Sequence, residues 1–290
     1  MSEMSDSGST PGVVVGVDGS AHSREAAEWA AREAERLHQP LTVCTVIVTI
    51  APEFHLEPQV TDAEWRRGNE IVEIAATQIA AAHRDVAVRR LVTSGQPGEE
   101  LIRVAERATT LVVGARGHGG FGALLLGSAS DYALTHASCP VVVVRGESWR
   151  EATPIVVGVD EKGSPAATQY AFEMASSLGA PLIAVRAFAL PAPLPKVGFD
   201  ADEQMRIHSH RYKGELFAAL AAMMEKHPDV TVHQWSEAGS PGARLVEASV
   251  QARLLVVGAH AHSEVAAVLL GSVSRQAVHH AHCPVAVVRS

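Results

Sequence analysis

The chain contains 290 residues, of which 47% are hydrophobic, 19% are charged and 4% are aromatic, and its formal net charge is −8. This length and composition are typical of a globular protein with two domains. The negative charge argues against a nucleic-acid-binding surface, which requires clustered Lys and Arg, and against adhesion to an anionic membrane.

Short apolar runs alternate with helical patterns along the first half. The continuous apolar run Val13–Val17 is typical of a strand in a sheet that is covered on both faces. A helical pattern follows and ends at Pro40, and either Ser20 or Ser23 is suited to cap its first turn. The remaining elements are predicted as strands over 41–48, 86–92, 111–113 and 140–144, and as helices over 62–83, from 97 onward, and over 127–137.

The second half repeats the first. The pattern Gly-x2-Gly-x9-Gly-Ser that begins at Gly114 recurs 144 positions later as Gly-x2-Ala-x9-Gly-Ser, beginning at Gly258. The first apolar run and the aspartate after it, Asp18, recur at an offset of 142, with Asp160 as the second aspartate. The smaller offset predicts an insertion, Glu161-Lys162, directly after the second aspartate.

These repeats divide the chain into four parts. We predict a disordered N-terminus over 1–12, a first domain over 13–145, a linker over 146–153 and a second domain over 154–290. Each domain is long enough to bury a core without a structural metal or a disulfide.

The alternation of strands and helices predicts the α/β class. Each half is expected to form a doubly wound domain, Rossmann-like or flavodoxin-like, with a five-stranded parallel sheet in the order 3-2-1-4-5 and helices on both faces. Ligands bind such sheets at the carboxyl ends of the strands where the topology reverses, here between strands 1 and 4. Asp18 follows strand 1 and the glycines follow strand 4, so both motifs are expected in one crevice.

The glycine loop has the chemistry of a phosphate cradle. Glycines let backbone amides approach an anion closely, and the start of a helix adds unpaired N–H groups and a favourable dipole. Gly127 and Ser128 begin the predicted helix, where the serine hydroxyl can donate to a phosphate, and Arg116 and His118 can supply positive charge. The alternative is a glycine-rich turn that serves packing alone.

Asp18 also has two interpretations. Its carboxylate can accept from a ribose hydroxyl or an adenine amino group, or hold Mg²⁺ through water. It can instead cap the helix that follows, which aspartate does well. Proximity to a phosphate loop favours the ligand role.

Two competing motifs are excluded. The residues from Gly117 to Gly122 match G-x-G-x-x-G, but no helix starts within them and no acidic residue follows at the right distance, so they are not a dinucleotide fingerprint. No Walker lysine follows Gly127, which argues against fast phosphoryl transfer.

The glycine pattern, the Val-Asp-Gly-Ser sequence after the first strand and the His-Ala-x-Cys-Pro sequence before the last one resemble the universal stress protein family. The resemblance covers residues 13–145 and 154–289, and the tandem arrangement is similar to two-domain members common in actinobacteria. It implies an ATP-binding α/β domain, self-association through the last strand, and a regulatory role under stress, dormancy or low oxygen.

The resemblance also implies which residues contact the nucleotide. In the first domain Asp18 would lie near the adenine and ribose, and Val46 would offer backbone groups to the adenine. The ribose and phosphates would be contacted by Gly114, Gly117, Gly127, Ser128 and Ala129. The counterparts in the second domain are Asp160, Ala187, Gly258, Gly271, Ser272 and Val273.

Two departures affect the second site. Ala261 replaces the second glycine, and a methyl group costs about 1 kcal/mol or more where the backbone requires positive φ or close approach of a phosphate. The predicted insertion also lengthens the loop beside Asp160. We therefore expect the first domain to bind ATP and the second to bind it weakly or not at all.

The leading hypothesis for function is an ATP-dependent regulatory switch without catalytic residues, in which Mg²⁺ accompanies the ATP. The alternatives are a slow ATPase or nucleotidyl transferase using the same crevice, a sensor of AMP or a cyclic nucleotide, and a nucleotide-free interaction scaffold. The final strands, Val141–Val144 and Val285–Val288, are apolar edges that require covering. We expect them to pair as an internal pseudo-dimer, with a homodimer or coverage by loops as alternatives.

The remaining cysteine and histidine patterns have modest implications. Cys139 and Cys283 each precede a proline and are expected to be small buried fillers, with a redox sensor as the alternative. The fifteen histidines include no H-E-x-x-H motif, so surface histidines are favoured over metal ligands. With three cysteines, no secretory signal and no apolar run that could span a bilayer, the expected location is the cytoplasm.

Overall fold

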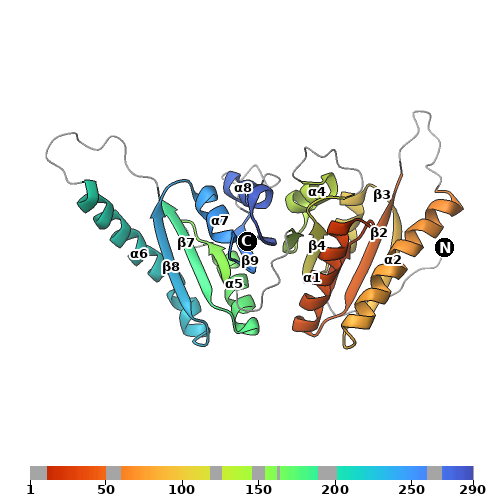
Figure 1. Ribbon diagram of the computed structural model, residues 1–290, viewed down its shortest axis with the longest axis horizontal. Coiled ribbons are helices and arrows are strands. Elements are labelled where there is room, and N and C mark those ends of the chain that lie inside the picture. Colours follow the sequence, from red (N-terminus) through yellow and green to blue (C-terminus); the bar gives the residue numbers. More distant parts are fainter. Residues whose placement is uncertain are drawn as a thin grey trace. The chain divides into compact units, whose positions relative to one another are not determined.

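The computed structural model separates into two compact units, Met1–Val144 and Arg145–Ser290. Strands and helices alternate throughout each unit (Figure 1). The predicted linker and all but Gly12 of the predicted disordered N-terminus lie outside the residues that the structure describes. The described residues are 12–49, 60–117, 126–145, 154–161, 164–188, 201–259 and 270–289, without the side chains of 201–208.

The elements of the first unit follow the predicted order. They are β1 Val13–Gly16, α1 Ala21–Leu37, β2 Leu41–Val48, α2 Asp62–Ala82, β3 Val88–Gly95, α3 Pro97–Val104, β4 Thr110–Gly114, α4 Ser128–His136 and β5 Val141–Val144. The strands lie side by side in the order β3-β2-β1-β4-β5, and every pair of neighbours is parallel.

The second unit has the same succession of elements. They are β6 Ile155–Gly158, α5 Pro165–Leu178, β7 Leu182–Phe188, α6 Ala201–Lys226, β8 Val232–Ala238, α7 Pro241–Ser249, β9 Leu254–Gly258, α8 Ser272–His280 and β10 Val285–Val288. Its strands lie in the order β8-β7-β6-β9-β10, again with parallel neighbours. The α/β fold class predicted from the sequence is confirmed.

Helices cover both faces of each sheet. In the first unit α1 packs beside α2 and α3 packs beside α4, and the second unit repeats this with α5 beside α6 and α7 beside α8. The contact between α3 and α4 is close, because a Cβ at Gly98 would stand 2.6 Å from the Cβ of Tyr132. The central strands are buried on both sides, which explains their continuous apolar runs.

The core is made largely of valine and alanine. The inward face of α1 carries Ala26, Ala30 and Ala34, all with no exposed surface, against strands that contribute Val13 and Val15. Small side chains on the helices allow close approach to the β-branched surface of the sheet. This packing is consistent with the small number of aromatic residues in the chain.

The boundary predicted for the third strand was displaced. The structure places β3 at Val88–Gly95, whereas the apolar pattern predicted residues 86–92. Val86 instead belongs to the turn after α2, where its N–H donates to the carbonyl of His83 over 3.2 Å. The strand continues to Gly95 because its pairing with β2 extends to the end of that strand.

The predicted insertion Glu161-Lys162 is wrong. The backbone N–H of Asp18 donates to the hydroxyl of Ser23, five positions later, over 3.3 Å. The N–H of Asp160 makes the same contact at 3.3 Å with Ser164, only four positions later, so the loop of the second unit is shorter by one residue. The extra residues lie between β7 and β8, because β7 begins 141 positions after β2 but β8 begins 144 positions after β3.

Two further predictions concern the surroundings of the chain. β5 and β10 each lie at one end of the strand order of their own unit, and the predicted pairing of these strands and the homodimer stay predictions. Within the described ranges, none of the helices combines the length and the apolar character needed to traverse a bilayer.

Candidate functional site

The carboxyl ends of β1 and β4 bring together the two motifs that were expected in one crevice. These strands are parallel neighbours, so the loops that follow them leave the sheet at the same edge. A Cβ built on Gly117 would stand 2.5 Å from Oδ2 of Asp18, closer than real Cβ atoms approach. Glycine is therefore the only residue that fits beside the carboxylate without displacing it.

The Asp18 carboxylate is held in place by the start of α1. Its Oδ1 accepts from the N–H of Ser20 over 3.0 Å, and the hydroxyl of Ser20 accepts from the N–H of Ser23 over 3.1 Å. Ser20 is thus the N-cap of α1, one of the two capping residues proposed from the sequence. Ser20, and not Asp18, therefore caps α1.

The start of α4 faces the same edge. Gly127 is its N-cap, with no side-chain hydrogen bond to the first turn, and its N–H donates to the carbonyl of Ala115 over 2.9 Å. The first N–H groups of a helix have no intrahelical partners, so this turn offers donors and a favourable dipole to an anion. Ser128 and Ala129 belong to this turn, and Ser128 is exposed. The predicted cation His118 lies outside the described residues, while Arg116 is exposed.

Gly114 has a packing role that the sequence did not reveal. A Cβ there would stand 2.9 Å from the backbone of His22, so glycine lets α1 approach β4. Its carbonyl accepts from the hydroxyl of Ser130 over 2.8 Å. Val46 is half-buried in β2, opposite Thr93 of β3. A ligand contact by Gly114 or Val46 stays a prediction.

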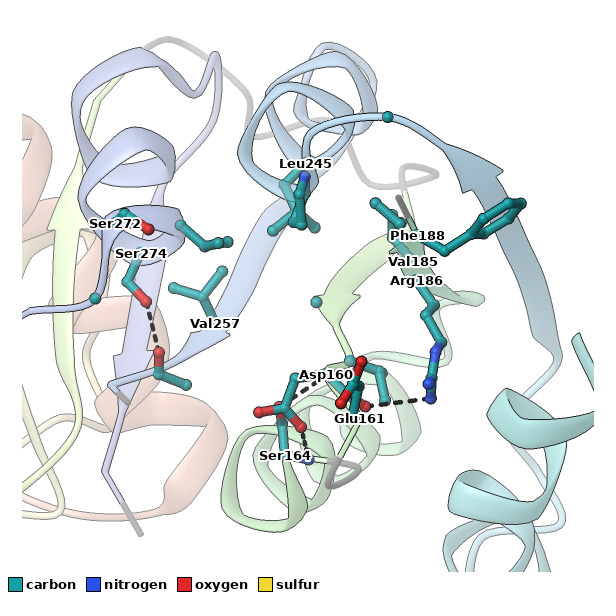
Figure 2. Close-up of a pocket in the computed structure, with 18 of the residues that line it drawn as sticks. Asp160, Glu161, Ser164, Val185, Arg186, Phe188, Leu245, Val257, Ser272 and Ser274 are labelled. Atoms are coloured by element: carbon teal, nitrogen blue, oxygen red, sulfur yellow. Dashed lines mark hydrogen bonds between the residues drawn. The ribbon is translucent and has the colours of Figure 1, made fainter. Parts of the chain in front are cut away.

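The second unit has an open cavity of about 440 Å³ at the equivalent edge of its sheet. Figure 2 shows the side chains that surround this cavity, with Asp160 and Ser164 on one side and Ser272 and Ser274 on another. The structure brings together the whole set of residues predicted for this site. The cavity is lined by Asp160, Ala187, Gly258, Gly271, Ser272 and Val273, together with other residues.

The glycine end of this cavity repeats the geometry of the first unit, whereas the aspartate makes a different contact: Asp160 accepts from a residue four positions later and Asp18 from one two positions later. Oδ1 of Asp160 accepts from the N–H of Ser164 over 3.1 Å, and the hydroxyl of Ser274 donates to the carbonyl of Gly258 over 2.6 Å. Gly271 is the N-cap of α8, again without a side-chain hydrogen bond to the first turn. Ala261, which was expected to weaken this site, lies outside the described residues.

Sequence reasoning missed one wall of the second cavity. Arg186, in the middle of β7, is only 6% exposed and donates through Nη2 to Oε2 of Glu215 over 2.8 Å. Its guanidinium lies 5.5 Å from the ring centroid of Tyr212, which is itself stacked on Phe188 at 4.3 Å. The sequence feature that could have indicated this wall is Arg186 itself, a charged residue inside the otherwise apolar strand β7.

The model of the universal stress protein family matches residues 12–145 and 151–289 of this chain. A universal stress protein of Mycolicibacterium smegmatis is 35% identical over 290 residues, covering 96% of this chain and 97% of that protein. Universal stress protein Rv2005c of Mycobacterium tuberculosis is also 35% identical, with the same coverage. The crystal structure of a universal stress protein from Archaeoglobus fulgidus is 19% identical, with a TM-score of 0.68 and 96% coverage of each chain, and shows the same fold. This chain belongs to the universal stress protein family and carries two tandem copies of its domain.

Proposed function

We propose that the first unit binds ATP at the carboxyl edge of its sheet and that occupancy of this site acts as a regulatory switch. The observation that carries the proposal is the placement of Asp18 against Gly117, beside the open start of α4. A carboxylate, a close-approach glycine and a set of free helix donors are the groups that a ribose and its phosphates require.

The phosphates would lie at the start of α4. The first-turn N–H groups of Ser128 and Ala129 would donate to phosphate oxygens, and the exposed Ser128 hydroxyl would add another donor. Gly127 would leave the approach clear, because it has no side chain to cover the turn. Mg²⁺ usually binds through substrate phosphates and water, so in this proposal it enters with the triphosphate.

The nucleoside would lie toward β1 and β2. Asp18 would accept from the ribose hydroxyls, since its position is already fixed by the Ser20 N–H. Backbone groups of Val46 would face the adenine, and Gly117 and Gly114 would border the ribose and phosphates. The helix dipole and the carboxylate act at opposite ends of the ligand, which fixes its direction in the crevice.

Ligand binding would reach the surface through α4. This helix packs against α3 through Gly98 and Tyr132 with no room for a larger side chain at the glycine. A phosphate bound to the first turn of α4 would hold that helix in one position, and α3 with it. A partner that contacts this pair of helices would then distinguish the occupied from the empty protein, which is the requirement for a switch.

One experiment tests the binding step. The full chain is purified, bound small molecules are released with acid and identified by mass spectrometry, and ATP affinity is measured by calorimetry. The matched variant is Gly127→Val. The backbone at Gly127 is extended, with φ −75°, and a Cβ would meet its nearest neighbours at 3.7 Å or more. The valine is therefore expected to cover the helix start without disturbing the fold.

We expect ATP to be released from the wild-type protein and binding to be lost in Gly127→Val. Incubation with Mg-ATP while phosphate release is followed then separates a switch from an enzyme, because rapid turnover supports the ATPase alternative. A wild-type protein with no measurable affinity for any adenine nucleotide would overturn the proposal and favour the scaffold.

A further inference from the structure

The two units can be aligned residue by residue around the cavity. β7 begins 141 positions after β2, and the ends of α6 and α2 match at 144 positions. Equivalent hydrogen bonds support the offset of 144 positions between α2 and α6: the N–H of His83 donates to the carbonyl of Ile79, and the N–H of His227 donates to the carbonyl of Met223. Equivalent positions in the two units can therefore be compared.

One corner of the site differs in three contacting positions at once. The first unit has small or apolar residues there, and the second unit has large or charged ones. Thr45, Gly68 and Ile71 in the first unit correspond to Arg186, Tyr212 and Glu215 in the second. Because Arg186 contacts both Glu215 and Tyr212, the three residues form one structural feature, which we call the arginine corner.

The arginine corner forms part of the cavity wall. Arg186 donates through Nη2 to Glu215 over 2.8 Å and through Nη1 to the carbonyl of Asp160 over 3.4 Å. A guanidinium has five N–H donors, and these two contacts use two of them. In Figure 2 the Arg186 side chain points toward Asp160 and Glu161. The wall thus places N–H donors beside the residues that follow β6.

The equivalent positions of the first unit, which the structure describes, have different chemistry. The hydroxyl of Thr45 is already used, since it donates to the carbonyl of Val17 over 2.5 Å. A Cβ at Gly68 would stand 2.9 Å from a methyl carbon of Val92, so α2 lies too close to the sheet for a tyrosine at that position. At the equivalent described positions of the first unit, the packing therefore leaves no place for a charged donor.

A second difference between the two units adds a hydrogen-bond acceptor at the same end of the cavity. Glu161 directly follows Asp160 and lines the cavity, whereas Gly19 directly follows Asp18 in the first unit. The cavity of the second unit thus has a guanidinium and an additional carboxylate at one end. At its other end lies the open start of α8, with Gly271 and Ser272.

We infer that the second unit selects an oxopurine nucleotide, such as GMP, over its adenine counterpart, with Arg186 and Glu161 as the specificity-determining residues. This inference rests on the proposed function, because it assumes that the open helix start holds a phosphate. The cavity of about 440 Å³ is within the range of small-molecule sites.

The base preference follows from hydrogen-bonding complementarity. Guanine presents two acceptors, O6 and N7, on one edge, and arginine pairs with both at once. Its N1–H and N2 amino groups are donors, which a carboxylate such as that of Glu161 accepts. Adenine places an amino donor where guanine has O6, so it would direct an N–H group at the guanidinium. One good bidentate pair discriminates between bases by about 10- to 100-fold in affinity.

The test uses the full chain with the first site blocked by Gly127→Val. Calorimetric titrations with GMP and with AMP measure the two affinities in this background. We expect GMP to bind at one site per chain, with at least about tenfold higher affinity than AMP. Gly271→Val, added to the same background, is expected to abolish GMP binding because it covers the start of α8.

The matched variant converts the arginine corner toward the first unit. Arg186→Thr combined with Glu215→Ile removes both members of the ion pair, so no unpaired buried charge is left. We expect GMP affinity to fall by about 10- to 100-fold and the preference over AMP to disappear. Arg186→Lys is the second variant: it keeps the positive charge but loses the planar pair of donors, so GMP should bind more weakly than to wild type while part of the preference over AMP remains. Thermal unfolding verifies that both variants are folded.

The outcomes separate this inference from the proposed function. Loss of ATP binding in Gly127→Val alone concerns only the first unit. Equal affinity for GMP and AMP in the blocked background, a preference that survives Arg186→Thr with Glu215→Ile, or no GMP binding at all would each overturn the inference. A GMP preference that depends on Arg186 supports it even if the first unit does not bind ATP.

Discussion

Oδ2 of Asp18 occupies the space beside Gly117 that any side chain would need, since a Cβ there would stand 2.5 Å from this oxygen. In Gly117→Ala the carboxylate must move away from the methyl group, although its other oxygen stays bonded to the Ser20 N–H. We expect ATP affinity to fall by at least about tenfold, equivalent to about 1.4 kcal/mol. Calorimetric titration of the full chain measures this change.

The control for that substitution is Gly214→Ala. Gly214 lies within α6, and a Cβ built there would meet no atom within 4 Å. Alanine is favoured over glycine inside a helix by about 0.5–1 kcal/mol, so this variant should unfold at a higher denaturant concentration. Its ATP affinity should equal that of the wild type. An equal loss of affinity in both variants would show that Gly117 has no special relation to the ligand.

The Glu100 carboxylate is expected to make part of the free energy of unfolding sensitive to acid. The hydrogen bond from Arg103, at 2.6 Å, lowers the pKa of Glu100; burial opposes this shift and the Thr93 hydroxyl adds to it. Because the folded pKa is below the unfolded one, this stabilisation is present at neutral pH and is lost as the pH falls through the lowered value.

Glu100→Gln should therefore reduce stability at neutral pH more than in acid. Since Arg103 is largely exposed, we expect the difference to stay below about 1 kcal/mol. Urea unfolding of the wild type and of Glu100→Gln, each near pH 7 and near pH 4 where the chain is folded, gives the four free energies of unfolding that are compared. A difference that grows in acid would contradict the assignment.

Equivalent histidines in the two units are expected to respond oppositely to the same substitution. His83, which follows α2, has Nδ1 2.9 Å from a carboxylate oxygen of Glu35 and Nε2 3.3 Å from one of Glu28. Nε2 of His227, its counterpart after α6, is buried with no hydrogen-bond partner among the described residues. Removing an unsatisfied polar group is favourable, whereas removing a bonded one is not.

His83→Met should therefore destabilise the chain by about 1–2 kcal/mol, while His227→Met should be neutral or stabilising. Denaturant unfolding with fluorescence and circular dichroism measures both variants, and the two units are allowed to unfold separately in the fit. Equal destabilisation by both substitutions would show that size and shape, rather than hydrogen bonding, decide these positions.

The repeat and the order of elements were sufficient to predict which residues lie together at one edge of each sheet. Parallel strands place all their following loops at one edge, so Asp18 and Gly117 had to meet there once the strands were assigned. The same reasoning predicted that Asp160 lies near the glycines of the second unit, and these residues line one cavity. The start of the third strand could not be predicted in the same way, because Val86 is held in a turn by a backbone hydrogen bond and backbone hydrogen bonds do not depend on the side chain.

The remaining errors arose from tertiary contacts. The insertion after Asp160 was inferred by comparing two offsets, but the contact with Ser164 shows that this loop is shorter and that the extra residues come later. The arginine corner was missed because Arg186 is distant in sequence from Tyr212 and Glu215 and meets them only when α6 packs on β7. A charged residue such as Arg186 in a buried strand is the signal that such a contact exists.

The three cysteines are expected to resist modification in the folded chain. All three are buried, and burial raises the pKa of Cys283 to about 12. Burial likewise raises the pKa of Cys44 to about 12, with a smaller contribution from Glu100 that Arg103 opposes. Only the thiolate reacts with iodoacetamide, so at about pH 8 Cys44 and Cys283 should stay unmodified in the native protein, and burial shields Cys139 from the reagent. All three should react in urea, and mass spectrometry counts the added groups.

The same pKa difference predicts the response to alkali. A thiol in the unfolded chain titrates near pH 8.5, well below the folded value of about 12 for Cys283. Between these values the unfolded chain binds fewer protons, so stability should fall as the pH rises through this interval. Cys283→Ala should show a weaker fall between about pH 8 and pH 10 in urea unfolding. Rapid alkylation of the native protein at about pH 8 would contradict both predictions, because it requires an accessible thiolate.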